Sequence, residues 1–525
     1  MGLKRSLIAV ASVAAICFAS GVQAKTFKWA FQGDAQSLDP HTLNETFTLG
    51  FLSNVYEGLV KRGPDLQIIP GLAESWELLD PNHWRFTLRK GVKFHNGNDF
   101  NADDVLFTFE RASKDGSDMK GKIGADTKVV KVDDFTVDFV TTQPNPILYY
   151  EWDNVLIMDK EWSEEHDATS PTDVTKDSEN YAAFHANGTG PFVIASRETD
   201  VRTVFKPNPA WWGEVKHNVT EGIFTPISSD ATRVAALLSG EIDMMYPIPV
   251  QDIRRIESNA GTSTLTGPEL RTIFLGMDQL RDELLYSNIK GKNPFQDQRV
   301  REAFYRAIDI ETIRKKIMRN LSTPSAIMIS PFLFSKSSKY ERLGYDPEAS
   351  KALLSDAGYP DGFELSMDCP NNRYVNDEAI CQAVVSMLAK VGVKVDLLAQ
   401  PKAQYFKKVL AFDTSFYLLG WTPGSFDSHN ALNNLLTCRH DPSVRAKFNL
   451  GGYCNPKVDA LTDEVLVETD PAVRDSKIEE AFDIVIEDVG YLPLHQQGLA
   501  WAKKDSVELV QRADNQFMLN FVQVK

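Results

Sequence analysis

The chain lacks the features that mark a membrane protein, a nucleic-acid-binding protein or a common hydrolase. No run after residue 24 approaches the roughly 20 apolar residues that a transmembrane helix needs. The formal net charge is −16, which excludes the basic surface that nucleic acids and anionic membranes require. There is no G-x-S-x-G elbow and no H-E-x-x-H helix. We therefore expect no nucleic-acid partner, no membrane span and no catalytic residues.

Two weaker patterns are better explained as ordinary structure. Gly116–Ile123 nearly matches a phosphate-binding loop, but Ile123 stands where the loop needs a hydroxyl group for magnesium. Histidines such as His95 and His429 lack the spacing of metal ligands, although one of them can still act in a pocket. We predict no cofactor and no metal.

Cysteine is also scarce, and its context matters. The first 24 residues read as a secretory signal, in which Lys4 and Arg5 precede the apolar run Leu7–Phe18. Small residues around Ala24 predict cleavage there, so the mature chain begins outside the cytoplasm without Cys17 and carries no lipid. Removing the signal changes the net charge to about −18.

Four cysteines remain after this cleavage, and an oxidising compartment favours disulfides between them. Of the three pairings that four cysteines allow, we favour Cys369–Cys381 and Cys438–Cys454. Each closes a short loop and stabilises the fold by about 3 kcal/mol. A four-cysteine metal site is the alternative, but the spacings lack the C-x-x-C knuckle that is usual in zinc sites.

The mature length of about 500 residues is too large for one core, so we expect two or three domains. A hydrophobic fraction of 43% is ordinary for globular domains. Strand patterns and helix patterns alternate along the chain, which indicates mixed α/β domains.

The stretch from Gly71 to Arg111 has the most informative pattern. Alternating apolar residues predict a strand over Trp84–Leu88, and flanking glycines predict a second short strand at Val92–His95. Asn101 is expected to cap a helix whose first turn holds Asp103 and Asp104, where negative charge suits the helix dipole.

The sequence of this stretch resembles that of the family 5 extracytoplasmic solute-binding proteins of ABC transporters, which are the oligopeptide and dipeptide type. Further resemblance lies at Asp34–Pro40, Gly188–Phe192 and Asn208–Trp212, so it extends over essentially the whole mature chain. Within the stretch the matching elements are Ala73-Glu74-Ser75-Trp76, Phe86-Thr87-Leu88-Arg89, Gly91-Val92-Lys93-Phe94-His95, Gly97 and Ala102-Asp103-Asp104-Val105.

The resemblance implies an α/β, two-lobed periplasmic-binding-protein fold with a double hinge and an extra inserted subdomain in lobe one. It implies a signal peptide at 1–24, lobe one at 25–278 with the insert at about 71–184, lobe two at 279–493, and a return to lobe one at 494–525. The expected protein is a periplasmic monomer. It captures a peptide-like or other polar small solute and delivers it to an ABC permease with its ATPase subunits.

The loop after Phe416–Leu419 gives the sharpest expectation about the ligand. In peptide-binding relatives this loop resembles G-W-x-x-D-Y-x-D-P, and the first aspartate of the motif binds the α-amine of the ligand. This chain has Gly424 and Ser425 at the aspartate and tyrosine positions, while Asp427 matches the second aspartate. We therefore expect weak or absent binding of ordinary dipeptides. Glutathione-like conjugates, opines and oligosaccharides are the alternative ligands, and a secreted hydrolase is the alternative function.

Seven residues are the ligand-binding candidates on these grounds. The tryptophan can stack on a ligand plane, the arginine can bind a carboxylate, and the amide and hydroxyl groups can donate hydrogen bonds. They are Gln36 and Ser37 in the opening loop, Arg373 and Tyr374 beside Cys369, and Trp421, Ser425 and Asn430 in the loop after Phe416–Leu419.

Overall fold

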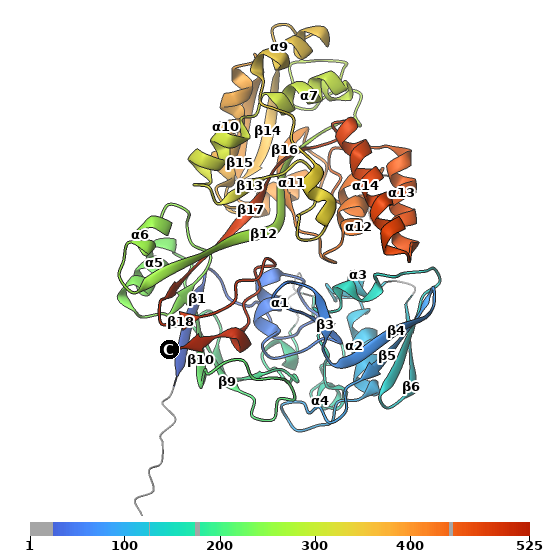
Figure 1. The fold of residues 1–525 in the computed structure, drawn as a ribbon, viewed down its shortest axis with the longest axis vertical. Coiled ribbons are helices and arrows are strands. Elements are labelled where there is room, and N and C mark those ends of the chain that lie inside the picture. The colour runs from blue at the N-terminus through green and yellow to red at the C-terminus, as the bar shows by residue number, and fades with distance from the viewer. Residues whose placement is uncertain (1–24, 125–126, 174–178, 440–444) are drawn as a thin grey trace, which may run out of the picture.

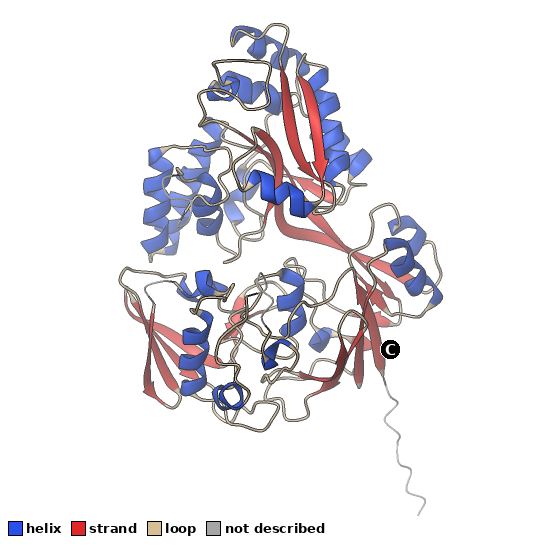
Figure 2. Cartoon of the chain, turned by 180° about the vertical axis from the view of Figure 1, so that it is seen from behind, coloured by secondary structure: helices blue, strands red, loops and turns tan. Residues whose placement is uncertain are grey.

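Two long strands join two bodies of the chain. The computed structural model describes residues 25–124, 127–173, 179–439 and 445–525. In it, β12 (Thr262–Met277) and β17 (Leu492–Lys504) run from the lower body to the upper body (Figures 1 and 2). We call the lower body of Figure 1, which contains β1 (Thr26–Phe31), lobe one, and the upper body lobe two.

A sheet of eleven strands passes through both lobes in the described part of the chain. Its order is β15-β14-β16-β12-β17-β11-β1-β10-β9-β8, and β13 pairs with β17 beside this path. The shared strands β12 and β17 pair antiparallel, and their register shifts between Pro268 and Thr272 and again between Ile273 and Phe274. The other bounds are β8 Phe192–Glu198, β9 Arg202–Pro207, β10 Glu221–Pro226, β11 Met244–Met245, β13 Ser322–Pro324, β14 Glu364–Pro370, β15 Lys394–Gln400 and β16 Phe416–Trp421.

A second sheet belongs to lobe one alone. Its order is β4-β5-β7-β6, with β4 Ala73–Asp80, β5 His83–Leu88, β6 Lys128–Asp133 and β7 Thr136–Val140. The strand predicted at Trp84–Leu88 is therefore confirmed. The strand predicted at Val92–His95 is wrong, because its backbone closes on its own loop: Phe94 N–H donates to Asn98 O and Phe100 N–H donates to Val92 O.

Helix α2 (Ala102–Ala112) packs against this second sheet and begins as predicted. The Asn101 side chain accepts from Asp103 N at 2.7 Å, and the Asp104 side chain accepts from Asn101 N at 2.9 Å. This reciprocal capping box satisfies amide groups that a helix start leaves free.

Helices and short strands complete both lobes. Lobe one has α1 Thr46–Leu52, α3 Lys120–Ile123, α4 Lys160–Glu165, α5 Asp230–Ser239, α6 Ile253–Glu257, the 3₁₀ helices η1 Leu148–Glu151, η2 Tyr181–Ala183 and η7 Leu519–Phe521, and strands β2 Val60–Arg62, β3 Ile68–Pro70, β18 Val507–Glu508 and β19 Gln523–Val524. Lobe two has α7 Gln298–Arg306, α8 Ile310–Thr312, α9 Pro347–Asp356, α10 Asp377–Ala389, α11 Lys402–Val409, α12 Ser428–Ala431, α13 Pro456–Val467, α14 Pro471–Glu487, the 3₁₀ helices η3 Pro294–Gln296 and η5 Ser335–Lys339, and the π-helices η4 Ile313–Ile317 and η6 Leu432–Leu436.

The sheet of lobe two is buried on both faces. Leu418 belongs to one apolar core with α7 and α10, whereas Tyr417 and Leu419 belong to another with α13 and α14. This explains why β16 is a continuous apolar run, since a strand covered on both sides has no polar face. It also fixes where the strand ends, at Trp421, and so positions the loop that follows.

Candidate functional site

A disulfide ties down the loop that carries Arg373. Cys369 at the end of β14 bonds to Cys381 in α10, and both residues are fully buried. Inside this closed loop the Asp377 carboxylate accepts from the backbone N–H groups of Arg373 at 2.8 Å and Tyr374 at 2.9 Å. The loop conformation is thus fixed by a covalent bond and by two charge-assisted hydrogen bonds. The second predicted disulfide, Cys438–Cys454, is also present.

Two guanidinium groups flank the ring of Tyr374. Those of Arg373 and Arg271 lie 5.2 and 5.7 Å from the ring centre. Arg271 also pairs with Glu269 at 3.3 Å, whereas Arg373 is exposed and forms no ion pair within 4.0 Å in the described part of the chain. The Tyr374 hydroxyl donates to Gly420 O at 3.4 Å, which places this cationic group beside the end of β16.

Trp421 and Asn430 are joined by a hydrogen bond. The Trp421 indole N–H donates to Asn430 Oδ1 at 3.2 Å, and the ring packs on Phe448 with centroids 4.8 Å apart. Asn430 Nδ2 in turn donates to Glu151 Oε1 at 3.4 Å. Because Glu151 belongs to lobe one, this chain of contacts crosses from one lobe to the other.

The loop tip between Trp421 and α12 also touches lobe one. Arg62 Nη2 donates to Ser425 O at 3.2 Å, and its guanidinium lies 4.7 Å from the Phe426 ring. Ser425 is 6% exposed, and its hydroxyl has no hydrogen-bond partner within the described ranges. Arg62 is held from behind by Asp153 at 3.7 Å.

Asp427 anchors this loop within lobe two. It caps α12 by accepting from His429 N at 2.8 Å, and both of its oxygens accept from Arg474, at 2.7 and 2.8 Å. Burial acts to raise the pKa of Asp427, but the Arg474 guanidinium outweighs burial and holds that pKa below its usual value. The aspartate is therefore a structural ion of lobe two.

Glu151 lies directly opposite Gly424. A Cβ atom built on Gly424 would stand 3.7 Å from Glu151 Oε1 and 3.8 Å from Oε2, and no atom of another residue is nearer to that position. Sequence reasoning missed Glu151, because nothing in its own segment of lobe one points to a loop in lobe two. The Glu151–Asn430 contact joins residues 279 positions apart.

This chain is similar to known proteins over most of its length and of theirs. The model of the bacterial extracellular solute-binding proteins, family 5, matches residues 67–443. The chain belongs to family 5. Among its relatives, the glutathione-binding protein GsiB of Salmonella typhimurium is 27% identical over 93% of this chain and 92% of its own length.

Solved structures show that family 5 proteins share this fold. The periplasmic binding protein DppA from Helicobacter pylori, in complex with the peptide STSA, has a TM-score of 0.77 at 22% identity, with 95% of this chain and 98% of that chain covered. CtaP from Listeria monocytogenes has a TM-score of 0.82 at 20% identity, with 95% and 99% covered. The predicted two-lobed α/β fold is confirmed, and the protein is a solute-binding component of an ABC importer.

The opening loop of this family 5 protein is arranged differently from the other candidates. Ser37 is 4% exposed, and its hydroxyl accepts from Asp39 N at 3.0 Å within its own turn. Gln36 is exposed, and in the described part of the chain no hydrogen bond links it to the interlobe residues. The structure thus brings Arg373 and Tyr374 together beside the end of β16, and Trp421, Ser425 and Asn430 together in the segment that follows, while the Ser37 hydroxyl is held within its own turn.

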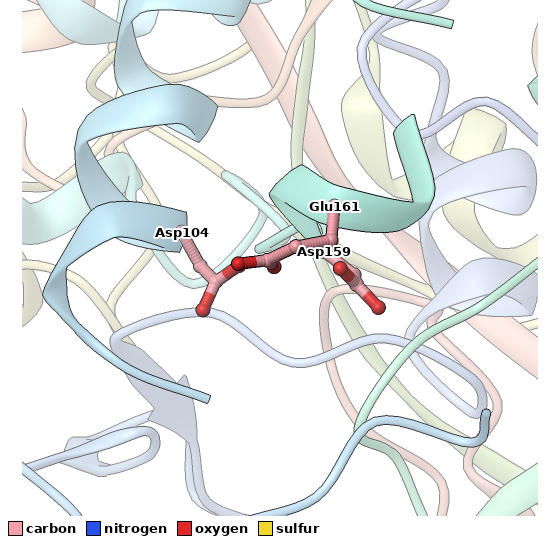
Figure 3. A group of neighbouring side chains, drawn as sticks. All are labelled: Asp104, Asp159 and Glu161. Carbon is pink, nitrogen blue, oxygen red and sulfur yellow. The ribbon is translucent and has the colours of Figure 1, made fainter. Parts of the chain in front are cut away.

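An acidic cluster in lobe one has the shape of a metal site. Each of Asp104, Asp159 and Glu161 offers a carboxylate oxygen within 4.8 Å of the others (Figure 3). The side-chain amides of Asn96, Asn98 and Asn187 all donate to Asp159 Oδ2. Because Asp159 and Asp104 already accept hydrogen bonds at the starts of α4 and α2, the cluster is explained as helix capping.

A cavity of about 230 Å³ also lies within lobe one. Glu57 forms part of its wall and accepts hydrogen bonds from the indole N–H groups of Trp211 and Trp212, at 3.3 and 2.8 Å. Lys61 pairs with the same carboxylate at 3.1 Å. These polar groups are all paired with the Glu57 carboxylate, so this cluster leaves none of them unpaired in the wall of the cavity. Within the described ranges, no helix is long and apolar enough to cross a membrane.

Proposed function

We propose that the protein captures a small, peptide-like solute that carries a carboxylate, and that Arg373 binds this carboxylate between the lobes. The lobes close on the solute by bending within β12 and β17, and the closed form docks on the permease, which partner ATPase subunits drive. The protein binds the solute without chemical turnover. It acts as a periplasmic monomer that begins near Lys25.

The observation that carries this proposal is the state of Arg373. It is an exposed guanidinium without an ion pair in the described structure, on a loop fixed by Cys369–Cys381 and Asp377. Guanidinium groups bind carboxylates through two parallel hydrogen bonds, and a preformed loop lowers the entropic cost of making them. Desolvation and the neighbouring Arg271 guanidinium lower the pKa of Arg373, and the smaller opposing attractions include that of Glu45 in lobe one.

The arrangement of the shared strands supports the closure. The register shifts at Pro268/Thr272 and Ile273/Phe274 interrupt regular pairing where β12 passes between the lobes, and such irregular positions absorb changes in backbone angles. We keep the division into lobe one at 25–278, with its insert at about 71–184, lobe two at 279–493 and a return at 494–525.

The named relatives support the ligand class. They include glutathione-binding proteins, and solved neighbours hold the peptides STSA and Met-Leu. Glutathione and these peptides all carry a free carboxylate. A further neighbour is described in complex with agropinic acid, so an opine is the second candidate.

Calorimetry with paired probes tests the proposal. We expect Met-Leu or glutathione to bind about ten- to a hundredfold more tightly than its carboxyl amide, since a hydrogen bond to a charged group contributes roughly 1.5–3 kcal/mol. Arg373→Gln should remove this preference and Arg373→Lys should retain part of it. Arg202→Gln, at an exposed residue of β9 in lobe one, is the matched control.

Equal binding of acid and amide by the wild-type protein would contradict the role of Arg373. Chromatography of each probe after incubation checks for turnover, because a converted probe would favour the secreted hydrolase. If neither probe binds, native mass spectrometry of the purified protein identifies the solute that it retains.

A further inference from the structure

Glu151 is held rigidly at the face of lobe one that meets lobe two. It ends the 3₁₀ helix η1, between Leu148 at 6% exposure and Trp152 at 0%. The Trp152 indole N–H donates to Lys122 O at 3.1 Å, and the ring packs against Phe109 and Phe139. With buried anchors on both sides, the Glu151 backbone has little freedom to move its carboxylate away.

This carboxylate has few partners of its own. In the described structure it accepts one long hydrogen bond, from Asn430 Nδ2 at 3.4 Å, and no cation lies within 4.0 Å of it. The nearby Arg62 forms an ion pair with the neighbouring Asp153 instead, at 3.7 Å. Burial raises the pKa of Glu151, with a smaller opposing effect from Lys122. A partly buried carboxylate in this state is stabilised by a cation that arrives from outside the protein.

Gly424 leaves room for such a cation. Apart from the two adjoining residues of the chain, no residue comes nearer than 3.7 Å to the position of a Cβ atom on Gly424, and the nearest atoms belong to the Glu151 carboxylate. Any side chain at position 424 would fill this space. The glycine therefore keeps the carboxylate of lobe one open toward the backbone of lobe two.

We propose that Glu151 binds the ammonium group of the ligand and supplies the carboxylate that the loop of lobe two lacks at Gly424. This inference rests on the proposed function and names a second charge on its solute. It replaces the sequence-based expectation that ordinary dipeptides bind weakly. The specificity-determining carboxylate comes from lobe one and also accepts a hydrogen bond from Asn430 of lobe two, so the proposed ammonium site lies at a contact between the lobes.

The two proposed charge sites would bind the two ends of a zwitterion. Tyr374, which packs against Arg373, contacts Gly420, and Glu151 faces Gly424. Four residue steps separate these two glycines, and a chain covers at most about 14 Å in four steps. Both proposed charge sites therefore adjoin one short segment of lobe two.

The test compares free and N-acetylated forms of the same probes, Met-Leu and glutathione, by calorimetry on the full mature protein. We expect the wild type to bind the free amine of at least one probe about ten- to a hundredfold more tightly than its acetylated form. Glu151→Gln should lose this preference while Glu151→Asp retains part of it. Glu165→Gln, on the exposed side of α4, is the matched control and should behave as wild type.

A second variant moves the carboxylate from position 151 to position 424. The test then does not depend only on a loss of binding. Glu151→Gln combined with Gly424→Asp returns one carboxylate to the same space, and it should recover preference for the free amine relative to Glu151→Gln alone. Thermal melting of each variant without probe shows whether the fold is retained. If the double variant folds but does not recover the preference for the free amine, then carboxylates at positions 151 and 424 do not serve the same ammonium site, and the proposal is wrong.

The remaining outcomes separate this inference from the proposed function. Equal binding of free and acetylated probes, or a retained solute that native mass spectrometry shows to lack an amine, overturns the role of Glu151 and leaves solute capture intact. No binding of any probe and no retained solute would overturn the proposed peptide-like ligand together with Glu151.

Discussion

The carboxylate of Glu151 in lobe one borders the space that a side chain on Gly424 in lobe two would enter. The separation is 3.7 Å between Glu151 Oε1 and the position of the missing Cβ atom. The loop thus has no carboxylate at position 424, and a glutamate of the opposite lobe lies within contact distance of that position.

Gly424→Asp alone should destabilise the protein in a pH-dependent way. It would place a second carboxylate against Glu151, and two such groups raise the pKa of one of them. A carboxyl group whose pKa is higher in the folded state than in the unfolded state loses stability as pH rises from the unfolded pKa to the folded one. We expect the melting temperature of the variant, relative to wild type, to fall between about pH 4 and pH 7. A constant difference across this range would contradict the contact.

Arg474→Ala should destabilise lobe two by about 3–5 kcal/mol, because it leaves the buried Asp427 carboxylate unpaired. Urea denaturation measures this loss. Arg474→Ala combined with Asp427→Ala should cost less than the sum of the two single changes. Strict additivity would show that the pair contributes little, and that the loop carrying Asn430 is held by other contacts.

Replacing Cys369 and Cys381 together with alanine should lower the free energy of unfolding by about 3 kcal/mol, since the bond closes a loop with a sequence separation of 12. The same change frees the segment that carries Arg373, so affinity for carboxylate-bearing probes should fall as well. Replacement of Cys438 and Cys454 is the control for a disulfide outside that segment. If both double variants bind these probes with equal affinity, then the Cys369–Cys381 disulfide does not contribute specifically to the binding site.

His41 should make the protein labile to acid. Burial and the Arg111 guanidinium lower the pKa of His41 to about 4, and its Nδ1 accepts from Arg111 at 2.9 Å while its Nε2–H donates to Leu156 O. Because the folded pKa lies below the usual value of 6.5, the neutral form is favoured by folding. This stability is complete above pH 6.5 and is lost as pH falls toward 4, by an amount on the order of 3 kcal/mol.

The measurement for His41 is thermal melting from pH 7 to pH 4.5, with His41→Gln as the comparison. The variant starts less stable, since glutamine does not reproduce both ring contacts, but it should lose less stability over this range. The difference between the two slopes isolates His41 from other buried histidines such as His429 and His495. Parallel curves would contradict the prediction.

Much of the local structure could be predicted from the sequence, because its causes lie within a few residues. Asn101 and Asp104 cap α2 through contacts three positions apart. The alternation in Trp84–Leu88 appears as β5, and the apolar run Phe416–Leu419 appears as the buried strand β16. The strand expected at Val92–His95 failed because its amide groups are satisfied inside a loop, which a pattern of apolar residues does not reveal.

The sequence by itself determined the family, the α/β class and the local disulfides, and its resemblance to peptide-binding proteins predicted that an aspartate is missing at Gly424. Only the tertiary structure decided which group stands opposite that glycine. Glu151 reaches it from another lobe, and Arg474 holds Asp427 from 47 positions further along the chain. Electrostatic contacts depend on distance in space, and a sequence without its fold gives distance only along the chain.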